Sequence, residues 1–172
     1  MEQEVARAWA LAGAKGIVLV GSNKELLDEP ASAIKAISPP TQVLALTADS
    51  ISNLGVEELF KQAIDSLGAI DVLDHAAGGT TTGVAGDSEL DVWFRDYEFN
   101  VKASYIVVHY YLKSSTTGTV IFLSTLGASF IFPELSSYSG RKLALMKLAE
   151  FLDAEKPDLR AFHGASGHCG CD

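Results

Sequence analysis

The sequence has 172 residues, of which 48% are hydrophobic, and its mean hydropathy is +0.19. This is enough apolar material for the buried core of one ordinary domain, and it excludes a disordered or fibrous chain. Thirteen Lys and Arg residues against 22 Asp and Glu residues give a net charge of −9. Such acidity argues against nucleic acid or an anionic membrane surface as a partner and favours a small molecule or another protein.

Short β-branched runs alternate along the chain with longer amphipathic segments. The predicted strands are nearly continuous apolar runs at 17–20, 43–46, 71–73 and 120–123, with a last short strand at 159–162. The predicted helices carry apolar residues three and four positions apart and span 4–14, 24–37, 56–67, 90–112 and 137–152. Continuous apolar strands are typical of parallel sheets covered on both faces. The alternation therefore predicts a doubly wound parallel α/β layer.

Two of the predicted helices are apolar nearly all the way round, at 105–112 and 143–149. One stripe of each helix covers the sheet, so the remaining apolar surface needs another cover. Self-association supplies it, and we expect a homodimer built on the helices around Tyr105 and Leu145. Loops of the same chain are the alternative cover.

Neither a membrane span nor a secretion signal is expected. The apolar stretch 105–112 is interrupted by His109 and is far shorter than the roughly 20 residues that cross a bilayer. The first four residues contain no basic side chain ahead of an apolar run. We expect a cytoplasmic protein without a membrane partner.

The C-terminus holds both cysteines, Cys169 and Cys171, which are too close together to form a useful structural bridge. A soft metal site could be assembled there from Cys169, Cys171, His163, His168 and Asp172. A glycine-rich stretch of this kind is more typical of a mobile end, so no metal site is predicted. We expect a single domain over 1–163 and a flexible tail over 164–172.

The most informative spacing joins Tyr138 and Lys142. Residues four apart project from one face of a helix, and an ammonium beside a phenol favours the phenolate. Tyr138 is therefore a candidate acid/base. A hydroxyl at the end of the preceding strand, from Ser124 or Thr125, would hold a substrate oxygen from the other side. Taken alone, the spacing also fits an ordinary surface tyrosine.

With their context, these residues resemble the short-chain dehydrogenase/reductase family. That family pairs a hydroxyl at a strand end with Tyr-x-x-x-Lys about thirteen residues later. The likeness extends to Asp-Val-Leu-Asp-His-Ala-Ala-Gly at 71–78 and to Phe-Asn-Val-Lys at 99–102. It covers most of the chain and implies a Rossmann-like fold and oxidoreductase chemistry on a carbonyl or alcohol of a small organic substrate.

The resemblance assigns a role to each matching residue. Tyr138 would be the general acid/base, Lys142 its activating cation, and Asn100 the holder of a relay water. Counting back thirteen residues from Tyr138 gives Thr125, whereas the expected residue type stands at Ser124. The strand ending aligns best with Thr125 in the catalytic place and Ser124 in a supporting one, and both remain candidates.

The resemblance also implies residues that bind NADP or NAD. Asp49 matches the family's adenine-contacting residue, and Ala77 and Gly78 lie in the segment that corresponds to Asn-Asn-Ala-Gly. Ser22 stands where NADP-using relatives often carry an Arg, which leaves NAD or NADP undecided. His75 replaces the first Asn of the family motif, and we expect it to cap backbone groups in a turn.

Two family segments have no counterpart in the sequence. No strand with Gly-x-x-x-Gly-x-Gly precedes the first helix, and no substrate-covering segment follows His163, so the chain looks truncated at both ends. A dinucleotide pyrophosphate needs such a glycine turn at a helix N-terminus. Glu2 and Glu4 place negative charge where it would bind. We therefore expect weak cofactor binding.

Three functions remain open from the sequence. The first is a family-type oxidoreductase with the site described above. The second is a cofactor-independent isomerase, dehydratase or cyclase that uses the same Tyr138 and Lys142. The third is a non-catalytic relative that dimerises or binds a partner through its apolar helices.

Overall fold

The computed structural model describes residues 2–165, which divide into two compact units between Ile70 and Asp71. Each unit has its own parallel sheet, β1–β2 in the first and β3–β4–β5 in the second. Parallel pairing in both sheets agrees with the near-continuous apolar runs of the strands. The expectation of one domain over 1–163 stays a prediction.

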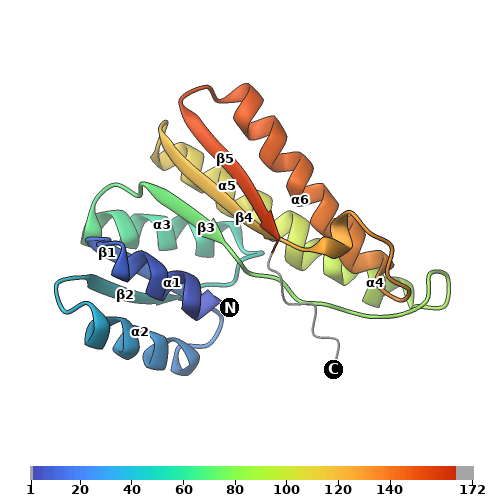
Figure 1. The fold of residues 1–172 in the computed structure, drawn as a ribbon, viewed down its shortest axis with the longest axis horizontal. Helices are drawn as coiled ribbons and strands as arrows, with labels where there is room; N and C mark the ends of the chain where they lie inside the picture. Colours follow the sequence, from blue (N-terminus) through green and yellow to red (C-terminus); the bar gives the residue numbers. More distant parts are fainter. Residues whose placement is uncertain (1, 166–172) are drawn as a thin grey trace. The chain divides into compact units, whose positions relative to one another are not determined.

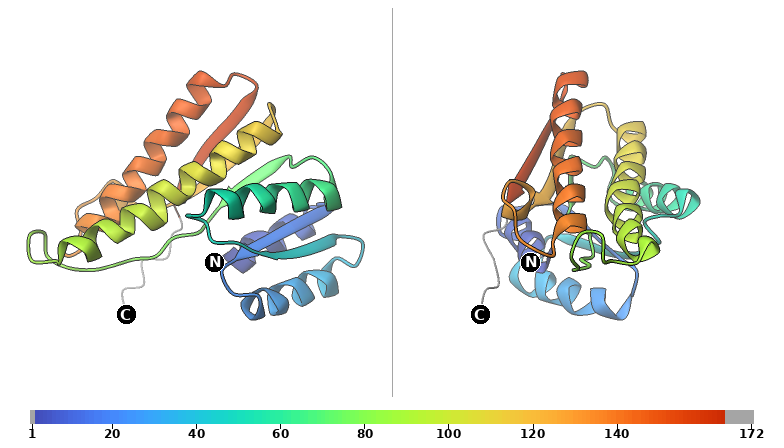
Figure 2. Two further views of the ribbon diagram at one scale, coloured as in Figure 1. Left: turned by 180° about the vertical axis from the view of Figure 1, so that it is seen from behind. Right: turned by 90° about the vertical axis from the view of Figure 1, so that its right-hand side faces the viewer.

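The first unit places helices on a two-stranded sheet. Its elements are α1 (Glu2–Leu11), β1 (Gly16–Gly21), α2 (Glu25–Ile37), β2 (Gln42–Thr47) and α3 (Asn53–Leu67). Helices α1 and α2 share a core with one sheet face, formed by Ala6, Ala10 and Ile34 against Ile17, Leu19 and Val43. Helix α3 lies on the opposite face (Figure 2). This unit therefore has the layered arrangement that alternating strands and helices predict.

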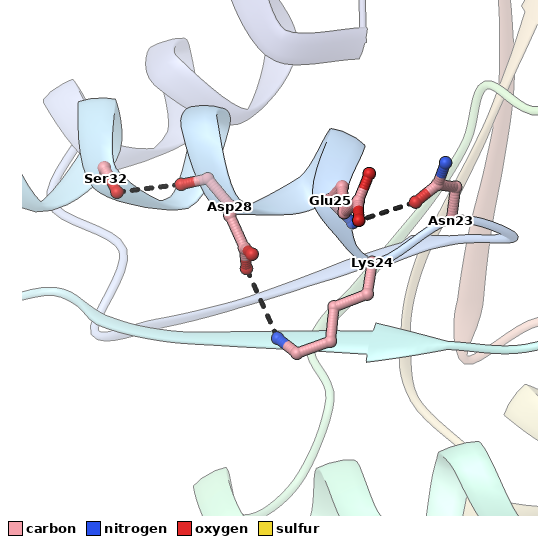
Figure 3. A network of polar contacts seen from close by, with 5 residues as sticks. All are labelled: Asn23, Lys24, Glu25, Asp28 and Ser32. Carbon is pink, nitrogen blue, oxygen red and sulfur yellow. Dashed lines mark hydrogen bonds and ion pairs between the residues drawn. The ribbon is translucent and has the colours of Figure 1, made fainter.

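The turn between β1 and α2 is organised by its own side chains. The Asn23 side-chain oxygen accepts a hydrogen bond from the Glu25 N–H at 2.9 Å, which satisfies a donor at the helix start. One turn on, Lys24 and Asp28 form an exposed ion pair at 3.3 Å (Figure 3). Ser32 donates to the Asp28 carbonyl at 2.8 Å. The local sequence thus fixes where α2 begins, three residues after Ser22.

The second unit carries most of the predicted site. Its strands are β3 (Val72–His75), β4 (Gly118–Ser124) and β5 (Leu159–Ala165), and its helices are α4 (Leu90–Tyr97), the π-helix η1 (Glu98–Lys102), α5 (Ala103–Ser114), the 3₁₀ turn η2 (Leu126–Ala128) and α6 (Ser136–Glu155). Strand β4 is central, paired with β3 and with β5. Helices α5 and α6 lie on the same face of this sheet (Figures 1 and 2).

The core of the second unit follows the period-two pattern of β4. Val120 and Phe122 are completely buried, whereas Ile121 and Leu123 between them are half-buried. On the helices, Val108, Tyr111, Leu145 and Ala149 are buried. Leu145 is therefore a core residue of this unit, and the homodimer expected on the helices around Tyr105 and Leu145 stays a prediction. The i, i+3 and i+4 pattern of α6 places Leu145 inward, and the exposed apolar residues are its neighbours on other faces.

The segment 90–112 differs from the single helix that its apolar pattern predicts. A π-turn at Glu98–Lys102 separates α4 from α5, and the N–H of Ala103 bonds to the Glu98 carbonyl five residues earlier. Insertion of one extra residue into a turn leaves the 3.6-residue pattern nearly unchanged on either side, so periodicity does not reveal it. The π-turn matters for the predicted site, because it contains Asn100.

The described residues reach only the start of the predicted C-terminal tail. Strand β5 runs to Ala165, past the expected domain end at 163. His168, Cys169, Cys171 and Asp172 lie outside the described residues. Within residues 2–165, no helix is long and apolar enough to cross a membrane.

Candidate active site

The predicted site residues gather where β3 and β4 end and α6 begins. The carboxyl ends of parallel strands meet at one edge of a sheet, and the loops that follow them form the usual site of α/β layers. His75 closes β3, Ser124 closes β4, and Tyr138 and Lys142 lie in the first two turns of α6. Asn100 reaches the same place from η1, through the contacts given below. The second unit by itself therefore contains all five predicted catalytic residues.

Lys142 joins α6 to the end of β4. Its ammonium donates a 2.6 Å hydrogen bond to the Leu123 carbonyl, and the residue is buried. The ammonium also lies 3.9 Å from the position that a Cβ on Gly78 would occupy. A buried ammonium requires such oxygen partners. The bond therefore fixes the position of Lys142 relative to the ends of both strands.

Asn100 occupies the space beside Gly78. It is completely buried, and its side-chain oxygen lies where a Cβ on Gly78 would be, so any side chain at position 78 would collide with it. Gly78 is thus required by close approach. Together with the Lys142 contact, this places Asn100, Gly78 and Lys142 in one cluster, as the family resemblance implies.

Tyr138 is half-buried and lies against Arg141. The guanidinium carbon of Arg141 is 4.4 Å from the centroid of the Tyr138 ring, a cation–π contact. Among the described residues, Arg141 has the largest fully buried side chain, and it donates a 3.1 Å hydrogen bond to the Thr80 hydroxyl. Among the described residues, the Tyr138 hydroxyl makes no hydrogen bond of its own. Arg141 thus braces the ring and leaves the hydroxyl available.

The two candidate hydroxyls differ in environment. Ser124 is buried, and its Oγ has no hydrogen-bond partner among the described residues. Thr125 is half-buried, and its Oγ1 accepts a 3.3 Å hydrogen bond from the Gly127 N–H at the start of η2. Since that bond uses a lone pair, the hydrogen of the Thr125 hydroxyl remains free to be donated.

His75 is a buried member of the cluster, and the expectation that it caps backbone groups in a turn is wrong. Its Nε2 is 2.7 Å from the Ser104 hydroxyl, and its ring meets Phe122 edge-on with centroids 6.1 Å apart. Burial, and secondly the positive charge of Lys142, lower the pKa of His75 from 6.5 to about 4. The ring is therefore neutral near pH 7. The strand end points it into the core, which a sequence alignment with a turn residue does not show.

Helix α4 is hydrogen-bonded to the start of α6. The Trp93 indole N–H donates to the Ser136 hydroxyl at 3.3 Å, and the Ser137 hydroxyl donates to the Trp93 carbonyl at 3.0 Å. The Trp93 ring stacks on Tyr97 with centroids 5.0 Å apart. These bonds hold the turn that presents Tyr138.

A mostly apolar hollow of about 500 Å³ lies beside this turn. It is bounded by the segment that follows Thr125 and by α6 residues that flank Tyr138 in the sequence, with Phe130, Phe132, Ser136, Ser139 and Leu143 among its lining residues. The size suits a small organic molecule.

The predicted nucleotide-binding residues are divided between the two units. In the second unit, Ala77 and Gly78 are exposed in the loop after β3. In the first, Ser22 and Asp49 are exposed after β1 and β2, respectively. One Asp49 carboxylate oxygen accepts the Ile51 N–H at 3.1 Å in the turn that leads to α3. The carboxylate thus keeps acceptor capacity at the carboxyl end of β2.

Sequence patterns missed several residues of the cluster. Arg141, Trp93 and Ser104 were not singled out, although Arg141 follows Gly140 directly before Lys142, where a large charged side chain is conspicuous among small residues. Their contacts join residues far apart in the chain. Within residues 2–165, no three His, Cys, Asp or Glu side chains are grouped as metal ligands.

Comparison with known proteins gives one consistent family. The family model described as short chain dehydrogenase matches residues 2–158. A short-chain dehydrogenase of Monascus purpureus is 28% identical over 157 residues, which cover 86% of this chain and 53% of that protein. The 3-ketodihydrosphingosine reductase of Bos taurus is 30% identical over 145 residues, which cover 81% of this chain and 44% of that protein. The chain spans about half the length of these curated relatives.

Solved structures confirm the predicted doubly wound fold. A short-chain type dehydrogenase/reductase from Mycobacterium marinum superposes with a TM-score of 0.91 at 21% identity, covering 96% of this chain and 69% of that one. An alcohol dehydrogenase from the archaeon Thermococcus sibiricus, complexed with 5-hydroxy-NADP, superposes with a TM-score of 0.84 at 21% identity. The match covers 94% of this chain and 69% of that one.

Substitution of Gly78 tests the close packing of the cluster. Gly78→Ala places a methyl group against the Asn100 oxygen, so we expect the free energy of unfolding to fall by about 1–3 kcal/mol. Gly79→Ala is the matched control, because a Cβ there meets no atom within 4 Å, and its effect should stay below about 1 kcal/mol. Urea unfolding of both variants measures the difference. Equal effects would contradict the packing described for Gly78.

The lowered pKa of His75 predicts an acid-sensitive stability. Unfolded His takes up a proton as the pH falls through 6.5, whereas native His75 does so only near 4, so protons favour the unfolded chain in this window. The stability that His75 contributes is complete above its unfolded pKa of 6.5 and is lost as the pH falls towards its native pKa of about 4. We expect His75 to account for about 2 kcal/mol of lost stability between about pH 7 and about pH 5.

The measurement is urea unfolding at both pH values for the parent chain and for His75→Gln. The variant should lose less stability on acidification than the parent does, because its side chain does not titrate. His109→Gln, which alters an exposed histidine on α5, should behave like the parent. Equal acid sensitivity in the parent and His75→Gln would show that His75 is not a buried neutral group.

Proposed function

Since the chain belongs to the short-chain dehydrogenase family, we propose that it interconverts a carbonyl and an alcohol on a small organic substrate. The observation that carries the proposal is the packing of the buried Asn100 and Lys142 against Gly78, next to a Tyr138 whose hydroxyl is unengaged by the described residues. Chemistry of this kind needs a proton donor and acceptor at the substrate oxygen and a hydride carrier. The cluster provides the first of these.

Tyr138 is the proposed acid/base. In the reductive direction its hydroxyl donates a proton to the substrate oxygen, and in the oxidative direction the phenolate accepts it back. Lys142 lies one helical turn further along α6, which places its ammonium on the same face of the helix as the phenol. Asn100 lies beside Gly78 and Lys142, where its polar side chain suits a water that returns the proton to solvent. Arg141 holds the Tyr138 ring through its contact with the ring face.

Thr125 is the proposed partner of the substrate oxygen. Its hydroxyl hydrogen is free, because its oxygen already accepts from Gly127. Ser124 lies on the same side of β4 as the fully buried Val120 and Phe122, which suits the supporting role. The apolar hollow, which Ser136 and Ser139 on either side of Tyr138 in the sequence help to line, favours a substrate with an apolar body next to its carbonyl group.

NADP or NAD is the proposed hydride carrier, and the residues fit it in part. Asp49 offers carboxylate oxygen to ribose hydroxyls, and the exposed backbone at Ala77 and Gly78 permits close approach. Ser22 carries no charge that would select a 2′-phosphate. A glycine-rich turn for the pyrophosphate is not among the 172 residues. When bound, the nicotinamide supplies or accepts hydride.

Substitution of Tyr138 or of Lys142 tests the proposed acid/base pair. Tyr138→Phe should abolish turnover, and Lys142→Met should lower it at least about a hundredfold, because proton transfer contributes about 10²–10⁴. The assay follows NADPH or NADH oxidation with a panel of apolar ketones at millimolar cofactor concentration. Tyr105→Phe, at an exposed tyrosine of α5, is the matched control, and circular dichroism verifies folding. Full activity of Tyr138→Phe would place the chemistry elsewhere.

Cofactor titration tests the part of the site that fits least well. Calorimetric titration of the 172-residue chain with NADPH and NADH should show weak binding, with a dissociation constant above about 10 μM, because the pyrophosphate lacks a glycine turn. Asp49→Asn should weaken it further, whereas Asp153→Asn, on α6, should not. Sub-micromolar binding by this chain would refute the expectation. Turnover without any added nicotinamide would instead favour a cofactor-independent reaction.

A homodimer through α5 and α6 is the proposed assembly. Tyr105, Leu143 and Phe151 on these helices are 59%, 53% and 54% exposed within one chain, which favours a second copy as their cover. Sedimentation at several concentrations should show a dimer, and Phe151→Glu should shift it to monomer. Leu54→Glu, an exposed leucine of α3 at 78%, is the control. A monomer at all concentrations would contradict this assembly.

A further inference from the structure

The π-turn η1 places Asn100 in the site. π-turns are rare within helices and disturb the regular hydrogen-bond pattern, so they persist where other contacts hold them. Here the turn ends at Lys102, and the completely buried Asn100 lies in its middle. The Asn100 side chain depends on this turn for its approach to Gly78. What holds the turn is therefore relevant to the site.

The Ser104 hydroxyl bonds to the turn from the first residues of α5. It donates to the Asn100 main-chain carbonyl, four residues earlier. A hydroxyl has a single hydrogen, and a carbonyl oxygen is only an acceptor. The Ser104 oxygen must therefore accept in its second contact, 2.7 Å from Nε2 of His75. It follows that His75 is the tautomer protonated on Nε2.

His75 donates this proton from a fixed position at the end of a paired strand. It is the last residue of β3, which pairs with β4, and it faces Phe122 of β4 edge-on with an interplanar angle of 73°. Its lowered pKa keeps the ring neutral near pH 7, which fits a single donor to Ser104. The chain of bonds therefore runs from the sheet through His75 and Ser104 to the Asn100 carbonyl.

We propose that His75 and Ser104 are positioning residues that hold the π-turn and thereby the Asn100 side chain in the site. Neither side chain is assigned a contact with substrate. The effect on turnover rests on the proposed function, whereas the effect on Asn100 does not. The role is specific to this chain in one respect, because an imidazole stands where the family motif has Asn.

The first test needs no variant and no activity. Long-range ¹H–¹⁵N correlation spectra of the labelled chain distinguish the two neutral histidine tautomers. We expect His75 to be protonated on Nε2 near pH 7 and to remain neutral to about pH 5. A His75 protonated on Nδ1 would overturn the proposal, because it has no proton to donate to Ser104.

The second test removes the bonds one at a time. Ser104→Ala and His75→Ala should each shift the side-chain amide resonance of Asn100. Ser114→Ala is the matched control, because Ser114 makes a similar 2.8 Å bond to the Tyr111 carbonyl at the far end of α5. It should leave that resonance in place. An Asn100 resonance that moves equally in all three variants, or in none, would overturn the proposal.

Turnover gives the third readout. We expect kcat to fall about tenfold in Ser104→Ala and in His75→Ala, with KM changed less than about twofold, because misplacement affects the reacting geometry. The double variant should resemble either single variant, since both act through one chain of bonds. A double variant whose loss in kcat is the product of the two single losses would overturn the proposal. Inactivity of the parent chain would count against the proposed function, while the spectra still decide the positioning role.

Discussion

The site depends on one buried ammonium. Lys142 lies inside the second unit, where an ammonium is stable only beside oxygen, and it donates to the carbonyl of Leu123. That bond joins the second turn of α6 to the end of β4. Tyr138, one turn earlier on the helix, and Thr125, two residues further along the strand end, are positioned by the same link. The arrangement is therefore a consequence of where a charge can be buried.

Close packing then determines which residues can surround the ammonium. Gly78 leaves room for the Asn100 oxygen, and a π-turn bends the α4–α5 segment so that Asn100 fills that room. Both features depart from regular structure, and both occur at the site. Backbone irregularities that persist in a folded chain need compensating contacts. The bonds of Ser104 to the Asn100 carbonyl and to His75 provide them.

Two further polar side chains distinguish the cluster from the pattern its family motif implies. His75 is buried near Lys142 and is neutral as a result, so it adds a hydrogen-bond donor without adding a second charge. The Arg141 guanidinium lies over the Tyr138 ring and donates a hydrogen bond to the Thr80 hydroxyl. One residue thus steadies Asn100 and the other steadies Tyr138. Both connect the site to the end of β3 or to the loop that follows it.

The sequence by itself determined most of the strands and helices, because β-branched runs and three- and four-residue spacings are local signals. It also determined the likeness to one family and placed Tyr138 and Lys142 on one helix face, since four residues make about one turn. Only the tertiary structure decided how His75 meets Ser104, 29 positions away, and how Arg141 meets Thr80, 61 positions away. It also revealed the π-turn at Asn100 and the burial of Leu145. Such contacts join segments whose separation along the chain carries no periodic signal, so packing alone selects them.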